Sequence, residues 1–98
     1  MITHSVFFTL KHPPGSPGEA AFLEAAREAL APIPGVRDFG QLRQTSPKSS
    51  FRFGFSMQFA DQSAYDAYNV HPSHVAFVRD HWVSEVADFQ EIDYEDLR

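Results

Sequence analysis

Two side chains in the second half of the chain have the types that proton transfer needs. His74 follows Tyr68 by six positions. A neutral imidazole beside a C–H acid can act as a general base near pH 7, because the unperturbed pKa of His is about 6.5. The Tyr68 hydroxyl could donate a hydrogen bond to a carbonyl oxygen and stabilise the enolate that forms. The pair indicates a proton-transfer site or a ligand site.

A structural interpretation of the same residues stands beside the functional one. Pro72 interrupts any helix between Tyr68 and His74, so helical spacing between them cannot be assumed. His71 could cap the helix that follows Pro72, His74 could bond back to the loop, and the ring of Tyr68 could pack into the core. The sequence leaves both interpretations open.

A third candidate, His4, lies in the first expected strand and shares a face with Val6 and Phe8. We expect this face to point towards the helices. A single His on an apolar face is most often a hydrogen-bonded core residue, although it can also line a ligand site.

A metal site is an alternative use of the histidines. His71, His74 and His81 could provide three imidazole ligands, but no carboxylate is placed by the sequence to fix their tautomers. With no Cys in the chain, thiolate metal sites and disulfides are excluded. We therefore predict no transition metal and no cofactor. A hard cation held by backbone carbonyls in the turn from Ile33 to Val36 is left open.

The elements that must position these residues follow from hydrophobic periodicity and breakers. Alternating apolar residues predict strands, and Ser16 and Asp61 are suitable N-caps for helices. The acidic side chains near the chain end are interpreted as a solvated strand edge. The expected strands are Ile2 to Leu10, Val36 to Gln44, Phe51 to Phe59 and Ala87 to Tyr94; the expected helices run from Pro17 to Pro32, from Asp61 to His71, and from Ser73 to about His81; and the acidic residues are Glu91, Asp93, Glu95 and Asp96.

This order predicts one α+β domain over residues 1–98, with the ferredoxin-like arrangement β-α-β-β-α-β. Two helices would then cover one face of a four-stranded antiparallel sheet. Phe7 and Phe8 place aromatic rings on both faces of the first strand. An uncovered apolar face is best buried by a second copy, so we predict a homodimer in which two sheets stack into a dimeric α+β barrel.

Composition and charge exclude several classes of partner. The chain has 98 residues and a net charge of −5 at pH 7, and its Lys and Arg residues form no basic block, so we expect no nucleic-acid partner. Apolar stretches are shorter than the roughly 20 residues that cross a bilayer. The first residues lack the basic segment of a signal peptide. We therefore expect a cytoplasmic protein with no membrane partner.

Three motifs together resemble a known family, the stress-responsive A/B barrel domain. They are Ile2 to Phe8 in the first strand, the turn Ile33-Pro34-Gly35-Val36, and the run from Asp61 to His74 that holds Tyr65, Tyr68 and His71-Pro72-Ser73-His74. The family includes plant stress proteins and a cofactor-free enzyme that cyclises a linear polyketide. The resemblance implies that His74 is the base, that Tyr68 orients the substrate, and that His4 lies beside them. That enzyme carries a further histidine where this chain has Phe53.

The sequence supports three hypotheses. The first is a homodimer that binds a small apolar or aromatic ligand between helix and sheet, in a pocket lined by His4, Phe53, Tyr68 and His74. The second is a cofactor-independent cyclase, isomerase or lyase in which His74, Tyr68 and His4 are catalytic. The third is a structural dimerisation module.

Overall fold

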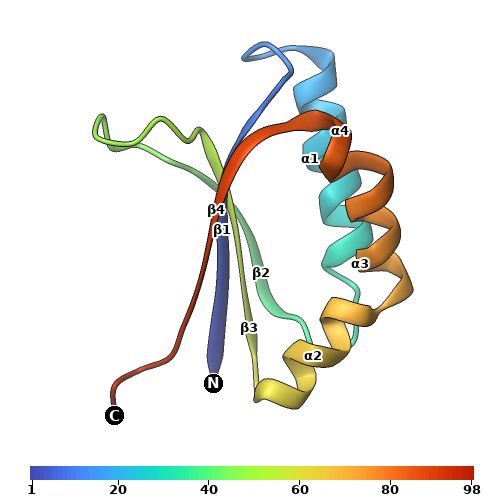
Figure 1. The fold of residues 1–98 in the computed structure, drawn as a ribbon, viewed down its shortest axis with the longest axis vertical. Coiled ribbons are helices and arrows are strands. Elements are labelled where there is room, and N and C mark those ends of the chain that lie inside the picture. Colours follow the sequence, from blue (N-terminus) through green and yellow to red (C-terminus); the bar gives the residue numbers. More distant parts are fainter.

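The chain forms one four-stranded antiparallel sheet with all of its helices on one side (Figure 1). A computed structural model describes residues 1–98. The strand order is β2-β3-β1-β4, which confirms the predicted ferredoxin-like fold. None of the helices combines the length and apolar character that crossing a bilayer requires. The elements are β1 Ile2–Leu10, α1 Pro17–Leu30, β2 Arg37–Arg43, β3 Phe53–Phe59, α2 Gln62–Val70, α3 Pro72–Phe77, the π-helical turn η1 Val78–Trp82, α4 Val83–Glu85 and β4 Val86–Tyr94.

Helix α1 begins at the predicted cap. The Ser16 hydroxyl accepts a hydrogen bond from the N–H of Glu19 at 3.2 Å, and Pro17 occupies the first turn, where its missing N–H costs nothing. The helix ends at Leu30, before Pro32. The turn after it is closed by a hydrogen bond at 3.1 Å from the N–H of Val36 to the carbonyl of Ile33.

The second helical region breaks where Pro72 predicts. Asp61 caps α2, accepting from the N–H of Ala64 at 2.9 Å. His71 is extended, with φ −63° and ψ 136°, and its Nδ1 accepts from the N–H of Ser73 at 3.1 Å to cap α3. The break turns the chain between Tyr68 and His74 and so fixes the direction in which each side chain points.

The helical region is longer than the sequence predicts. The expected end near His81 is wrong, because the π-helical turn η1 and the short α4 continue the path to Glu85. The carbonyl of Glu85 then accepts a hydrogen bond from the N–H of Lys11 at 2.8 Å, which ties the end of this region to β1. The extra turn places Trp82 over the sheet.

The inner face of the sheet, which the helices cover, carries the core. Phe8 and Phe59 are fully buried, and the rings of Phe8 and Phe55 meet edge to face with centroids 4.7 Å apart. Burial of each such side chain contributes about 1.5 to 3 kcal/mol. Every second residue of β3 contributes to this core: Phe53, Phe55, Met57 and Phe59 are all buried.

The outer face of the sheet has no helix over it (Figure 1). Leu42, Ile92 and Tyr94 are 42%, 51% and 54% exposed there. The ring of Phe7 lies across Gly54 so closely that a Cβ on this glycine would stand 2.4 Å from the ring. The sheet therefore presents a second apolar surface that the chain does not cover.

Candidate functional site

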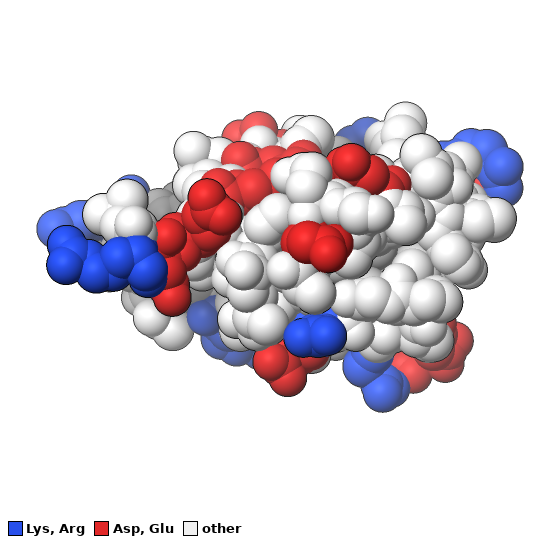
Figure 2. All heavy atoms as spheres, turned by 90° about the horizontal axis from the view of Figure 1, so that it is seen from below, with Lys and Arg blue, Asp and Glu red and all other residues white.

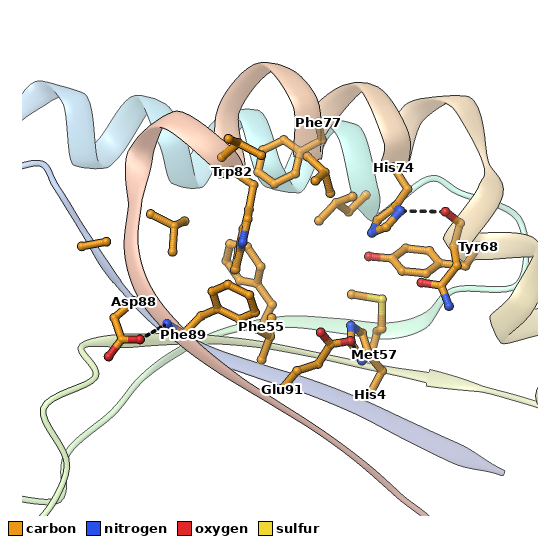
Figure 3. A pocket seen from close by; sticks show the side chains of 17 residues that line it. His4, Phe55, Met57, Tyr68, His74, Phe77, Trp82, Asp88, Phe89 and Glu91 are labelled. Atoms are coloured by element: carbon orange, nitrogen blue, oxygen red, sulfur yellow. Dashed lines mark hydrogen bonds and ion pairs between the residues drawn. The ribbon is translucent and has the colours of Figure 1, made fainter.

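A cavity of about 640 Å³ lies between the inner face of the sheet and the second helical region (Figure 3). Its volume falls in the range of about 300 to 1,000 Å³ that is typical of small-molecule sites. It is lined by 17 residues, namely His4, Val6, Leu30, Phe55, Met57, Tyr68, Asn69, His74, Phe77, Val78, Trp82, Val83, Val86, Ala87, Asp88, Phe89 and Glu91.

One end of the cavity is aromatic. Phe55, Phe77, Trp82 and Phe89 line it, and the rings of Trp82 and Phe89 meet edge to face with centroids 5.5 Å apart. Phe89 comes from β4 and Trp82 from η1, so this end joins the edge strand to the helical region (Figure 3). Trp82 packs against the core ring of Phe8 and also has a surface on the cavity.

Tyr68 and His74 meet at the other, polar end of the cavity. Their ring centroids are 4.5 Å apart, with α2 supplying Tyr68 and α3 supplying His74. The Nδ1 of His74 lies 3.1 Å from the carbonyl oxygen of Asn69. Because a carbonyl can only accept, Nδ1 carries the proton and Nε2 carries a free lone pair. Figure 3 shows the ring of His74 and the Tyr68 hydroxyl both directed into the cavity.

The Tyr68 hydroxyl has no hydrogen-bond partner in the protein. The residue as a whole is only 2% exposed, but its hydroxyl oxygen is not fully enclosed, because it opens on the cavity. Burial, and after it the charge of Glu91, raise the pKa of Tyr68, so the hydroxyl stays protonated at neutral pH. It is a donor without an acceptor.

Burial also sets the charge of His74. It lowers the pKa of this imidazole below 6.5, and the hydrogen bond to Asn69 opposes the shift without cancelling it. The side chain is therefore neutral at pH 7. A neutral imidazole with a free Nε2 and a protonated phenol can accept and donate one hydrogen bond each.

His4 belongs to a three-residue network beside this pair. Its Nδ1 lies 2.6 Å from Oδ1 of Asp93 and 2.9 Å from the Tyr65 hydroxyl, which itself donates to Oδ2 of Asp93 at 2.7 Å. His4 is 6% exposed and faces the helices, as its position in β1 predicts. The Nε2 of His4 has no hydrogen-bond partner in the protein and opens on the cavity.

The acidic residues of β4 lie on a solvated edge, as the sequence predicts: β4 is an edge strand, and the side chains of Glu91 and Asp93 are 49% and 38% exposed. Asp93 pairs with His4 across the sheet and Glu91 pairs with Val6, so both carboxylates are on the inner face. The sequence did not predict their further contacts, in which Asp93 bonds His4 and Glu91 lines the cavity. The alternation of Phe89, Glu91 and Asp93 was the available signal, but the sequence does not say which face of an edge strand lies inward.

Phe53 is not at the cavity, although the sequence placed it there with His4, Tyr68 and His74. It lies two residues along β3 from Phe55, which does line the cavity, and its ring is in contact with Arg43 and Arg52, whose guanidinium carbons are 5.5 Å and 5.3 Å from the ring centroid. The structure thus brings together three of the four predicted side chains.

The three histidines of the second helical region are not brought together. His71 caps α3, His74 bonds Asn69, and His81 lies 2.9 Å from Glu85. A different set, His4, Glu91 and Asp93, has ligand atoms within 4.8 Å of one another and could hold a cation. A metal there would first have to displace the proton that Nδ1 of His4 shares with Asp93.

Comparison with known proteins assigns the chain to a family. Residues 2–96 match the Stress responsive A/B Barrel Domain. The chain belongs to this family. A Dabb family protein with a ferredoxin-like fold from Mesorhizobium loti, known from a crystal structure, is 59% identical in sequence to this chain. The match covers 99% of this chain and 97% of that chain, and the two structures superpose with a TM-score of 0.98. A search of curated proteins gives no match.

More distant members of the fold resemble this A/B barrel domain in structure alone. A dimeric ferredoxin-like protein of unknown function from Thermobifida fusca is 18% identical over 97% of this chain and 90% of that chain, with a TM-score of 0.76. A hydroxynitrile lyase from Passiflora edulis is 11% identical over 99% and 94% of the two chains, with a TM-score of 0.83. These likenesses support the fold and leave the ligand open.

Proposed function

We propose that this A/B barrel domain binds a small apolar or aromatic molecule in the cavity between sheet and helices. The observation that carries the proposal is the Tyr68 hydroxyl, a donor with no protein partner that opens on a cavity of about 640 Å³. A ligand that supplies an acceptor there would form one hydrogen bond with it, which contributes about 0.5 to 1.5 kcal/mol. The aromatic end would hold the apolar part of the same molecule.

The single Trp of the chain makes this proposal testable. Trp82 lines the cavity, so ligand binding should change its fluorescence. We expect 4-propylphenol to give a saturable change, and Tyr68→Phe to weaken binding about fivefold through loss of one hydrogen bond. Tyr94→Phe, on the outer face, is the matched control and should bind as the parent does. A change that does not saturate, or equal affinity in both Tyr variants, contradicts the proposal.

We propose, second, that two copies associate through the outer face of the sheet. Leu42, Ile92 and Tyr94 are exposed there, and a shallow hollow of about 210 Å³ involves Phe7 and Phe51 on the same side. Three structural neighbours are described as dimeric, which supports the assignment. Light scattering at micromolar concentration should give twice the chain mass of 11.1 kDa, and a monomer would contradict the proposal.

Proton abstraction next to a carbonyl is a second candidate function. The free Nε2 of neutral His74 beside the Tyr68 hydroxyl is the observation that favours it. His74 would remove the proton as a base, and the hydroxyl would stabilise the enolate oxygen, with no cofactor.

Deuterium exchange at the α-carbon of 4-phenyl-2-butanone in D2O tests this chemistry by NMR. The domain should accelerate exchange, His74→Gln should abolish the acceleration, and His81→Gln, which lies outside the cavity lining, should retain it. Exchange that is no faster than in buffer would leave binding as the function. Loss of both binding and exchange, with an intact dimer, would favour a structural module.

A further inference from the structure

The polar end of the cavity contains more hydrogen-bond acceptors than donors. Glu91 lines it with a side chain that is 49% exposed and whose carboxylate accepts no hydrogen bond from the protein, and Nδ1 of His4 lies 3.8 Å from its Oε1. Figure 3 shows this carboxylate turned towards His4 and Met57 inside the cavity. An unpaired carboxylate beside apolar rings calls for a donor from the ligand.

The imidazole of His74 adds an acceptor. Its Nδ1 donates to Asn69, so the ring presents a lone pair at Nε2. The Tyr68 hydroxyl is the one donor among these groups, and its oxygen can accept as well. A ligand with several N–H donors would satisfy the set better than a carbonyl alone, because the Tyr68 oxygen can then act as one of the acceptors.

The charge of the lining has one sign. It includes Asp88 and Glu91 but neither Lys nor Arg. The whole chain has a net charge of −5 at pH 7. Figure 2, a view from below Figure 1, shows acidic side chains across the middle of the face and basic ones mostly towards its outline. The Asp88 carboxylate accepts a hydrogen bond from the N–H of Phe89 and points away from the cavity (Figure 3). An anionic ligand would therefore meet repulsion from Glu91, whereas a cation would meet this one carboxylate and several aromatic faces.

We propose that the cavity selects a protonated amine carried on an aromatic or branched apolar group. This deepens the proposed binding function and rests on it. The ammonium lies at the polar end, donating to Glu91, to Nε2 of His74 and to the oxygen of Tyr68. The apolar group lies against Trp82 and Phe89 at the other end. The preference acts against carboxylates of the same size, because no basic side chain lines the cavity to pair with them.

Three probes that share a ring system and differ in charge test the preference. They are 2-(1-naphthyl)ethylamine, 2-(1-naphthyl)ethanol and 1-naphthylacetate, titrated by calorimetry into the full-length protein near neutral pH. We expect the amine to bind about tenfold tighter than the carboxylate, with the alcohol between them, and the ratio to shrink as salt screens the charges.

Two variants assign the effect to the cavity. Glu91→Gln should reduce the ratio of amine to alcohol affinity about fivefold, since it removes the charge and keeps the shape. Glu95→Gln, a change at an exposed residue outside the lining, should leave the ratio unchanged. Binding of all three probes with the carboxylate equal to or tighter than the amine overturns the charge preference while the ligand site stands. Failure of all three to bind overturns the ligand site and the preference together.

Discussion

The two faces of the sheet are built from the same strands but differ in what covers them. On the inner face Phe8 is 0% exposed and packs against helix α1 through Phe22, with ring centroids 5.7 Å apart. On the outer face Ile92 is 51% exposed and no helix lies above it. Residues that are neighbours in one strand thus point to opposite faces of the sheet, one covered by helices and the other uncovered.

The difference shows how a single sheet can carry a core, a cavity and the proposed interface with a second copy. The inner face is closed around Phe8 and Phe22 but opens on the cavity beside Tyr68 and His74, which lie on either side of the helical break at His71. Substitutions on the inner face should therefore act on stability and ligands, and those on the outer face on association.

The largest effect is expected for truncation of the core. Phe8→Ala should lower the free energy of unfolding by about 3 to 5 kcal/mol, because it leaves a void among aromatic rings. Urea unfolding measures the loss. Phe7→Ala, its neighbour on the outer face, is the control and should cost clearly less. Equal losses would mean that the two faces contribute alike to the stability of the single chain.

A smaller effect is expected from the network under the cavity. Asp93→Asn should lower the free energy of unfolding by about 1 to 3 kcal/mol, since the buried Nδ1 of His4 and the Tyr65 hydroxyl lose their shared carboxylate. Thermal unfolding compares it with Asp96→Asn, an exposed change near the chain end. A loss no greater than in the control would show that the network is not structural.

The pH dependence of stability should reveal His74. Because burial lowers its pKa in the folded state below 6.5, the unfolded chain binds this proton more readily. The free energy of unfolding should therefore fall as pH decreases from above 6.5 through the lower pKa of the folded state. Urea unfolding from about pH 7.5 to about pH 5.5 should show a shallower fall in His74→Gln than in the parent. A steeper fall in the variant would contradict the direction of this shift.

The smallest change in the stability of the single chain is expected on the outer face. Ile92→Glu should alter it by only about 0.5 kcal/mol, because the side chain is half exposed. It should nevertheless abolish the proposed dimer, since two copies would bring charges together across an apolar interface. Light scattering distinguishes the two effects, with Glu95→Gln as control. A dimer that survives Ile92→Glu would place the interface elsewhere.

Local signals predicted most of the fold and part of the site. The alternation in β1 and β3, the caps Ser16 and Asp61, and the break at Pro72 are short-range features, and each element formed where they indicated. The π-helical turn that places Trp82 has no comparable local signal. It depends on how the helical region packs across the sheet, which the residues alone do not state.

The site was only partly predictable for a related reason. His4, Tyr68 and His74 belong to motifs that resemble the family, and they meet at one cavity. Asp93 and Glu91 lie in an edge strand, where the inward face is decided by pairing with β1 rather than by composition. Phe53 satisfies the alternation of β3, but alternation fixes a face and not a position along it.

The most direct test of the account is a chemical-shift map of the domain with and without 4-propylphenol. We expect saturable changes in the chemical shifts of the indole N–H of Trp82, the methyl group of Met57 and the imidazole nitrogens of His74, which all line the cavity. The chemical shifts of the methyl groups of Ile92 and Leu42, on the outer face, should not change. Changes confined to the outer face, or none at saturating ligand, would contradict a ligand site between sheet and helices.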